Sequence, residues 1–293
     1  MKIERIDLFT GAKCNNNCIF CVLNDRFKDS PGKNTEKVIE DMKKNIINCN
    51  FLTLTGGEPT IRKDIFELIR KAKEIGYKTI HLQTNARMLS YDLICRKLIK
   101  LGVNSFTVSL HAHNEELGDL LSRTKGSFRQ TINGIKNIKK FGGNLITNTI
   151  IIKENYKNLL DIIKLAVDLG ADQIQMVFVR PKGQAFKNFK TTIPKLKDVI
   201  PYVNASIDYC KKLDKIVLVE GIPVCLMEDY KENVAEKKMP KAKIIFEDAV
   251  NNRNTSKLKF KKCAGCKLNK ECTGLWTNYA KIYGFGELNP IKY

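Results

Sequence analysis

Three cysteines near the N-terminus have a spacing that suits iron–sulfur chemistry. Cys14, Cys18 and Cys21 form a C-x3-C-x2-C run directly after a predicted first strand. Cysteine thiolates hold iron–sulfur clusters, and three of them can ligate three irons of a [4Fe–4S] cube. The fourth iron would lack a protein ligand, so it could bind a substrate or cofactor. Zinc would need a fourth cysteine or histidine close by, and the following 25 residues contain neither.

A glycine-rich turn, Gly56-Gly57-Glu58-Pro59, follows the second predicted strand. Glycines remove side chains where the backbone must approach a ligand closely. The carboxylate of Glu58 could accept a charge-assisted hydrogen bond from an ammonium group. Pro59 stiffens the turn. The turn is therefore a candidate binding site for a small molecule that carries an amino group.

A second group of cysteines lies in the C-terminal third: Cys225, Cys263, Cys266 and Cys272. Four thiolates can close one cluster completely, and metal binding would organise a segment with few strand-length apolar runs. Zinc is the alternative, because C-x2-C pairs serve both metals. Cys210 is a further candidate ligand, although a cysteine within a helical pattern is more often a small buried hydrophobe.

The elements that would position these residues alternate along the chain. Runs of β-forming residues predict six strands, at residues 3–10, 51–55, 79–84, 105–110, 145–152 and 173–179. Between them, apolar residues recur at helical spacing, as at Val38, Met42 and Ile46. This alternation favours parallel strands with right-handed crossovers, in an α/β fold. A doubly wound sheet and a full or partial barrel both remain possible.

Polar or glycine-rich residues follow four of the predicted strands. They are the Gly56 to Pro59 turn, Thr84 with Asn85, Ser109 with His111, and Arg180 with Pro181. Because parallel β/α folds carry their chemistry at the carboxyl ends of the strands, we expect these residues at one site. His111 is the candidate catalytic residue among them.

The C-x3-C-x2-C run, with Phe20 before its last cysteine, and the Gly-Gly-Glu-Pro turn together resemble the radical S-adenosylmethionine (SAM) superfamily, over residues 1 to about 181. The resemblance implies a partial (β/α)6 barrel and a [4Fe–4S] cluster whose open iron binds SAM. It also implies reductive cleavage of SAM to a 5′-deoxyadenosyl radical, which abstracts a hydrogen atom from a substrate. The residues expected to bind SAM are Gly56, Gly57, Glu58, Pro59, Thr84, Asn85, Ser109, Arg123, Val179 and Arg180.

The C-terminal cysteines resemble the SPASM and half-sized twitch extensions of that superfamily. The resemblance implies an auxiliary [4Fe–4S] cluster and a division into a core domain, residues 1–193, and an extension, residues 194–293. A full SPASM pattern continues with another cysteine where this chain has Trp276. We therefore expect one auxiliary cluster, which relays electrons or braces the fold.

The net charge of +20 raises the question of an acidic partner. Lysine is spread along the whole chain and is not interleaved with aromatic residues as in a single-strand groove, so solvated charge is a sufficient explanation. A non-enzymatic alternative is a nucleic-acid-binding module in which both cysteine groups are structural metal sites. The sequence contains no apolar run near 18 residues and no signal-peptide pattern, so we expect a cytoplasmic protein without a transmembrane segment.

The substrate follows only from the resemblance. SPASM and twitch relatives commonly modify peptides or protein side chains, so this class is the first expectation. The positive charge keeps a nucleotide, a tRNA or an anionic small molecule or lipid as alternatives. The expected reductant is a protein such as flavodoxin or ferredoxin.

Overall fold

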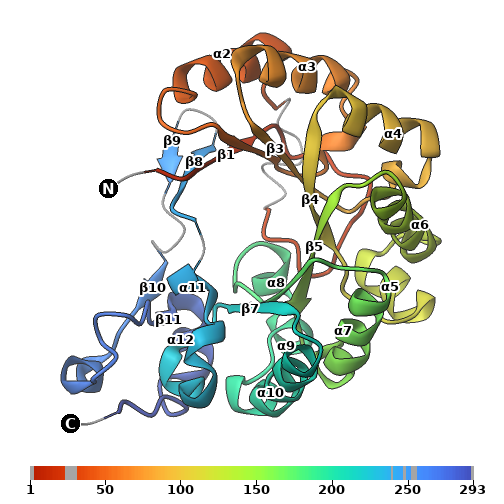
Figure 1. The fold of residues 1–293 in the computed structure, drawn as a ribbon. Coiled ribbons are helices and arrows are strands. Elements are labelled where there is room, and N and C mark those ends of the chain that lie inside the picture. Colours follow the sequence, from red (N-terminus) through yellow and green to blue (C-terminus); the bar gives the residue numbers. More distant parts are fainter. Residues whose placement is uncertain (1–2, 24–31, 239, 247–248, 252–255, 292–293) are drawn as a thin grey trace.

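The computed structural model describes residues 3–23, 32–238, 240–246, 249–251 and 256–291. One large sheet dominates it, with the strand order β7-β6-β5-β4-β3-β2-β1-β8-β9. Strands β1 to β8 pair in parallel and β9 runs antiparallel to β8. The sheet curls into an open arc with helices on its outer side (Figure 1). The predicted α/β fold, a partial barrel, is confirmed.

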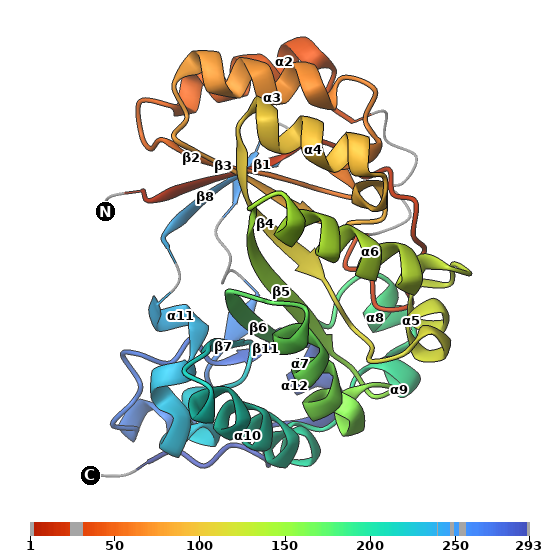
Figure 2. The same cartoon turned by 45° about the vertical axis from the view of Figure 1, so that its right-hand side comes forward.

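The strands of the arc are β1 (Arg5–Phe9), β2 (Phe51–Thr55), β3 (Thr79–Thr84), β4 (Val103–Ser109), β5 (Asn144–Ile151), β6 (Gln173–Phe178), β7 (Ile216–Glu220), β8 (Ala242–Phe246) and β9 (Ala249–Asn251). A separate pair, β10 (Lys257–Leu258) and β11 (Leu275–Trp276), is antiparallel. Both views place this pair beside β7, at the end of the arc (Figures 1 and 2).

The helices are α2 (Thr35–Asn45), α3 (Ile65–Ile75), α4 (Asp92–Leu101), α5 (Glu115–Ser122), α6 (Ser127–Lys140), α7 (Leu159–Asp168), α8 (Gln184–Lys187), α9 (Phe189–Thr192), α10 (Leu196–Lys212), α11 (Ala235–Lys238) and α12 (Thr277–Tyr283). Asparagine side chains start two of them: Asn34 accepts a hydrogen bond from the Lys37 amide, and Asn114 accepts one from the Leu117 amide.

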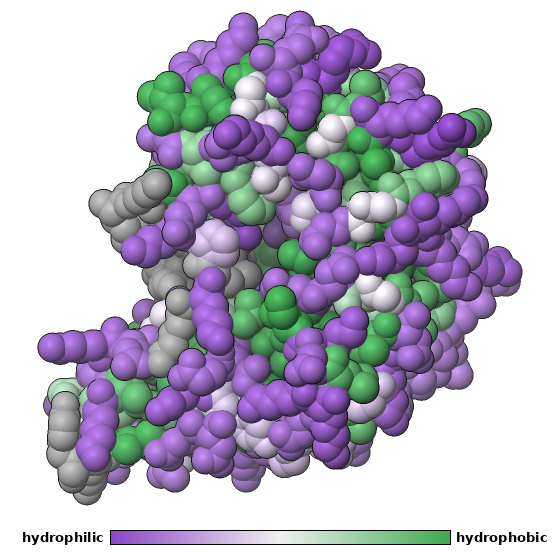
Figure 3. All heavy atoms as spheres, viewed as in Figure 1, coloured by the Kyte–Doolittle hydropathy of each residue, from purple (hydrophilic) through white to green (hydrophobic). Residues whose placement is uncertain are grey.

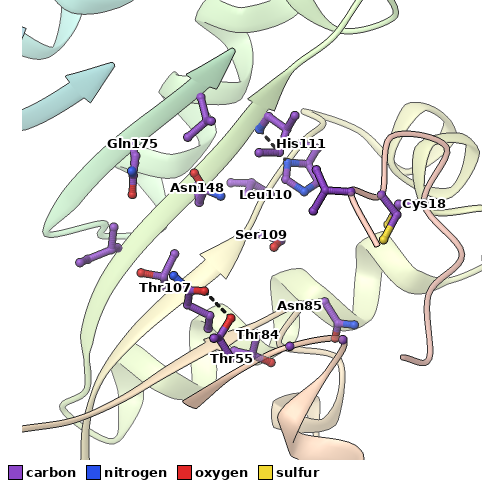
Figure 4. Close-up of a pocket in the computed structure, with 18 of the residues that line it drawn as sticks. Cys18, Thr55, Thr84, Asn85, Thr107, Ser109, Leu110, His111, Asn148 and Gln175 are labelled. Atoms are coloured by element: carbon purple, nitrogen blue, oxygen red, sulfur yellow. Dashed lines mark hydrogen bonds between the residues drawn. The ribbon is translucent and has the colours of Figure 1, made fainter. Parts of the chain in front are cut away.

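Alternation along the strands divides the sheet into two faces. The outer face is apolar and packs against the helices, with Leu82, Phe106 and Ile174 completely buried. The inner face is largely polar and lines a cavity (Figure 4). Parallel strands buried on both faces normally read as continuous apolar runs, and the polar residues on this inner face are consistent with its facing a cavity.

The sheet continues beyond residue 193, where we predicted the core domain to end. Helix α10 packs on α7, and β7 pairs with β6 as a further parallel strand. Strand β8 returns to pair with β1 at the opposite end of the arc. The predicted extension therefore contributes two parallel strands to the main sheet, and the two-part division remains a prediction.

Candidate active site

The inner face of the arc encloses a cavity of about 1720 Å³. The three N-terminal cysteines, both glycines of the turn and the ends of strands β3 to β6 all line it. Figure 4 shows Cys18, Thr84, Asn85, Ser109 and His111 around this space, reaching it from different elements. Outside the cavity, hydrophilic residues cover most of the face shown in Figure 3.

The loop after β1 brings the three cysteines together. Burial raises the pKa of Cys14 to about 11 and that of Cys18 to about 12. The negative charges of neighbouring groups add to this: Cys21 and Glu58 for Cys14, and Cys14 and Cys21 for Cys18. Three close thiolates need a positive counter-charge, and the irons of a cluster would supply one. The donor set and its setting thus fit an iron–sulfur cluster.

The glycine turn packs directly on the cysteine loop. The amide of Gly57 donates to the carbonyl of Gly11 and that of Glu58 to the carbonyl of Lys13, both at 2.8 Å. A Cβ on Gly56 would lie 2.3 Å from the Gly11 oxygen, and one on Gly57 would lie 2.2 Å from the Lys13 oxygen. Glycine is required here because the backbone of the turn lies close to the backbone of the cysteine loop.

Glu58 lies behind the cavity wall, with only 2% of its surface exposed. Its carboxylate accepts four hydrogen bonds: from the amide and hydroxyl of Thr60, at 3.0 and 2.5 Å, from the hydroxyl of Thr84, at 2.7 Å, and from the amide of Asn85, at 2.6 Å. Burial raises the pKa of Glu58, and these hydrogen bonds oppose the rise. The buried Pro59 begins a short 3-10 turn beside it. Glu58 thus ties the turn to the end of β3.

The end of β3 also holds the cysteine loop. The side-chain amide of Asn85 donates to Asn15 Oδ1 at 2.7 Å and lies 3.8 Å from Cys14 Sγ. The guanidinium of Arg87 donates to the carbonyl of Asn15 and, at 2.8 Å, to Asn16 Oδ1. We did not predict a role for Arg87, although it follows Thr84 and Asn85 at the same strand end and could have been found there.

The other predicted SAM-binding residues divide into two groups. Ser109, Val179 and Arg180 line the cavity at the ends of β4 and β6. Arg123 is exposed, caps α5 in a left-handed conformation with φ of 52°, and is not among the residues that line the cavity. The structure therefore brings together all of the predicted set except Arg123 and the buried Glu58 and Pro59.

His111 is held in one orientation beside the cysteine loop. Its Nδ1 accepts a hydrogen bond from the amide of Ile150 at 3.1 Å, so the ring proton sits on Nε2. Burial lowers the pKa of His111 to about 4, which keeps the ring neutral. The edge of the ring contacts Phe20, with the centroids 4.8 Å apart. The geometry gives His111 a fixed tautomer at the cavity wall.

Polar residues in mid-strand form a further part of the wall, and our sequence analysis did not assign them to the site. His81 contacts the hydroxyls of Ser105 and Thr107, at 2.8 and 2.9 Å. Thr55 donates to the side chain of Gln83 at 2.6 Å. The signal was present as polar residues at every second position of predicted strands. On strands β3 to β6 the polar residues that line the cavity and were not predicted to do so are Thr79, His81, Gln83, Asn104, Ser105, Thr107, Asn144, Asn148, Gln173 and Gln175.

The C-terminal cysteines form a second, separate group. Cys225, Cys263, Cys266 and Cys272 line a small apolar pocket. Burial raises the pKa of Cys225 to about 11, and the negative charges of the other three contribute, which places all four near one another. Cys210 is fully buried in the hydrophobic core and does not line this pocket.

Within the described residues, no three His, Cys, Asp or Glu side chains are arranged around the position of a single metal ion. The thiolates of an iron–sulfur cluster bind separate irons, so this finding does not bear on a cluster. Also within the described ranges, no helix is both long and apolar enough to cross a membrane.

Comparison with known proteins identifies a family and relatives of this chain. The Radical SAM superfamily model matches residues 8–166, more than half of the chain. A probable GTP 3′,8-cyclase of Sulfurisphaera tokodaii is 30% identical over 190 residues, which cover 64% of this chain and 60% of that protein. One of Saccharolobus islandicus is 28% identical over 235 residues, covering 78% and 75%. The chain thus spans about three fifths to three quarters of the length of these two relatives.

Solved structures resemble the whole chain. SuiB of Streptococcus suis, bound to its precursor peptide SuiA, aligns with a TM-score of 0.69 at 16% identity, over 100% of this chain and 75% of that one. At this identity the likeness concerns the fold alone. The family match, the thiolate loop and the glycine turn point to one conclusion. This chain belongs to the radical SAM superfamily and is a radical SAM enzyme.

Proposed function

We propose that this chain cleaves SAM reductively at a [4Fe–4S] cluster held by Cys14, Cys18 and Cys21, and takes a hydrogen atom from an anionic substrate of the nucleotide class. One observation carries the proposal: the three cysteines, the glycine turn and a polar wall built by four strands all face a single cavity. When bound, the cluster and SAM would supply the radical chemistry. The protein's part is to place both beside the substrate.

The chain's own residues fix the position of the cluster loop. Backbone hydrogen bonds from Gly57 and Glu58 hold it on one side, and the side chains of Asn85 and Arg87 hold it on the other. The neutral His111 presents a ring N–H at the cavity wall. Because burial keeps the His111 ring neutral, we assign this residue a binding role.

The charge of the cavity favours an anion. Four cationic side chains on its wall have no ion-pair partner among the residues that the structure describes: Lys13, Arg180, Lys182 and Lys238. A fifth cation, Arg5, is paired with Asp7 at 2.7 Å, which leaves Glu220 as the remaining acidic group on the wall. The wall therefore carries an excess of positive charge that attracts anionic substrates.

The names of the relatives favour a nucleotide among such anions, since both are called probable GTP 3′,8-cyclases. A peptide or protein substrate was our first expectation. Its support is a likeness of fold to a peptide-bound enzyme, and fold alone does not identify a substrate.

Three further parts belong to the proposal. The C-terminal thiolates would hold one auxiliary [4Fe–4S] cluster in a unit formed by residues 194–293, beside a core of residues 1–193. Cleavage of SAM consumes an electron, so the enzyme would work with a low-potential donor such as flavodoxin or ferredoxin. We also propose a cytoplasmic location.

The test is isotope transfer from substrate to cofactor product. The anaerobic, reduced enzyme is incubated with SAM and either GTP or ATP deuterated at carbon, or with a deuterated peptide. We expect deuterium in 5′-deoxyadenosine when a nucleotide is present. Deuterium transfer from the peptide alone, with none from either nucleotide, would contradict the nucleotide proposal.

A further inference from the structure

Arg180 connects the barrel to the C-terminal segment. It follows β6, and its Nη2 donates to Ser256 Oγ at 2.5 Å. Its guanidinium carbon lies 4.9 Å from the centre of the Trp276 ring. Both Arg180 and Trp276 line the cavity, as does Ser256. Two residues of the C-terminal segment, Ser256 and Trp276, therefore hold the guanidinium at a cavity wall.

Two cations lie over the Trp276 ring, and they differ in how their charge is balanced. Lys257, 4.6 Å from the ring centre, forms an ion pair with Glu236 at 2.6 Å. No described carboxylate lies within ion-pair distance of Arg180, and the nearest acidic influence on it is Glu220. Arg180 is half-buried, and this burial lowers its pKa. A partly desolvated charge that has no ion-pair partner is stabilised when an anion binds to it.

The free donors of Arg180 suit one class of ligand. A guanidinium has five N–H groups in a planar fork that matches phosphate oxygens, and the contact with Ser256 uses one of them. Lys182, two residues further along the chain, adds an exposed ammonium at the same wall. Neutral ligand groups would leave this charge unbalanced, whereas a phosphate chain would neutralise it.

We propose that Arg180, placed over the Trp276 ring and held by Ser256, binds the phosphate chain of the anionic substrate. This proposal rests on the proposed function and makes it more specific, because it assigns the charged end of the substrate to the side of the cavity next to the C-terminal segment. The family resemblance instead predicted that Arg180 lies near the adenine of SAM. The two roles differ in which ligand loses affinity when the guanidinium is removed.

Trp276 makes the test direct, because the chain contains one tryptophan. The tryptophan fluorescence of the protein therefore reports on the ring that Arg180 lies over. The anaerobic holoenzyme is titrated with inorganic triphosphate, which lacks a nucleobase. We expect a saturable change in emission, and in Arg180→Gln a loss of triphosphate affinity of about tenfold or more, since charge-assisted hydrogen bonds are lost. Arg70→Gln, an exposed arginine on α3 that does not line the cavity, is the matched control and should bind as the wild type does.

The SAM concentration dependence of uncoupled cleavage separates the two roles of Arg180. Under the proposal, Arg180→Gln leaves the KM for SAM unchanged while triphosphate affinity falls. Arg180→Lys keeps the charge but not the planar fork, so its triphosphate affinity should lie between that of the wild type and that of Arg180→Gln. An equal triphosphate affinity in wild type and Arg180→Gln, or a rise in the KM for SAM as large as the loss of triphosphate affinity, would overturn the proposal. Nucleotide turnover by isotope transfer is measured separately, so the proposed function could still stand.

Discussion

At the residue scale, the carboxylate of Glu58 was expected to accept a hydrogen bond from a ligand, and in the structure it accepts hydrogen bonds from the protein itself. Each of its oxygens accepts hydrogen bonds from the chain, from Thr60, Thr84 and Asn85. The sequence identified the residue, because a carboxylate in a glycine turn is informative. It could not show that the strand beside the turn would supply the donors, since that depends on the register between β2 and β3. Its role as an acceptor for an ammonium group stays a prediction.

His81 makes the stability of the protein depend on pH. Burial, helped by the charge of Arg5, lowers the pKa of His81 from 6.5 to about 3. Between these values the unfolded chain binds a proton that the folded chain excludes, so the free energy of unfolding falls as pH drops below about 6.5. The fall attributable to His81 should be on the order of 1 kcal/mol per pH unit.

Urea unfolding at several pH values between about 7 and 5 measures this dependence. The variant His81→Gln can still hydrogen-bond to Ser105 and Thr107 but carries no titrating ring. Its unfolding free energy should fall less steeply than that of the wild type in this range. Equal slopes would contradict this prediction, because they would show that the fold does not lower the pKa of His81.

At the element scale, the contact between the glycine turn and the cysteine loop sets the site. In Gly57→Ala the new Cβ would lie 2.2 Å from the carbonyl oxygen of Lys13 and 2.3 Å from that of Ala12. Both are backbone atoms, so the loop itself must move. We expect a loss of about 1–3 kcal/mol of stability, with a loss of iron from the N-terminal cluster.

The matched control is Gly286→Ala, where an added Cβ would meet nothing within 4 Å. Urea unfolding and iron content are measured for both variants. If the two alanine variants have the same midpoint and the same iron content, the turn does not support the loop as we describe.

The elements themselves were partly predictable. Strands β2 and β3 have the predicted bounds, because turn residues flank their β-forming runs on both sides. Strands β7 and β8 were not predicted. Each is a short apolar run beyond the regular alternation of strand and helix, and its place in the main sheet depends on pairing with β6 or β1. Pairing between segments distant in sequence is not encoded in local pattern.

At the scale of the whole molecule, two thiolate groups stand at separate places, one on the cavity and one in a small pocket beside the C-terminal strand pair. The cavity joins the cysteine loop at one end to Arg180 and Trp276 at another. Substrate would thus lie between the radical source and the C-terminal segment, in contact with both. Residues after position 193, among them Glu220, Ser256 and Trp276, form part of the cavity wall.

One measurement tests the central claim most directly: production of 5′-deoxyadenosine from SAM by the reduced, anaerobic enzyme, with iron quantified in the same samples. The comparison is between the wild type and a variant with Cys14, Cys18 and Cys21 all changed to alanine. We predict that the variant lacks about four irons and makes no 5′-deoxyadenosine, while it keeps the irons of the C-terminal group. Undiminished 5′-deoxyadenosine from the triple variant would contradict the claim that these three thiolates hold the cluster that cleaves SAM.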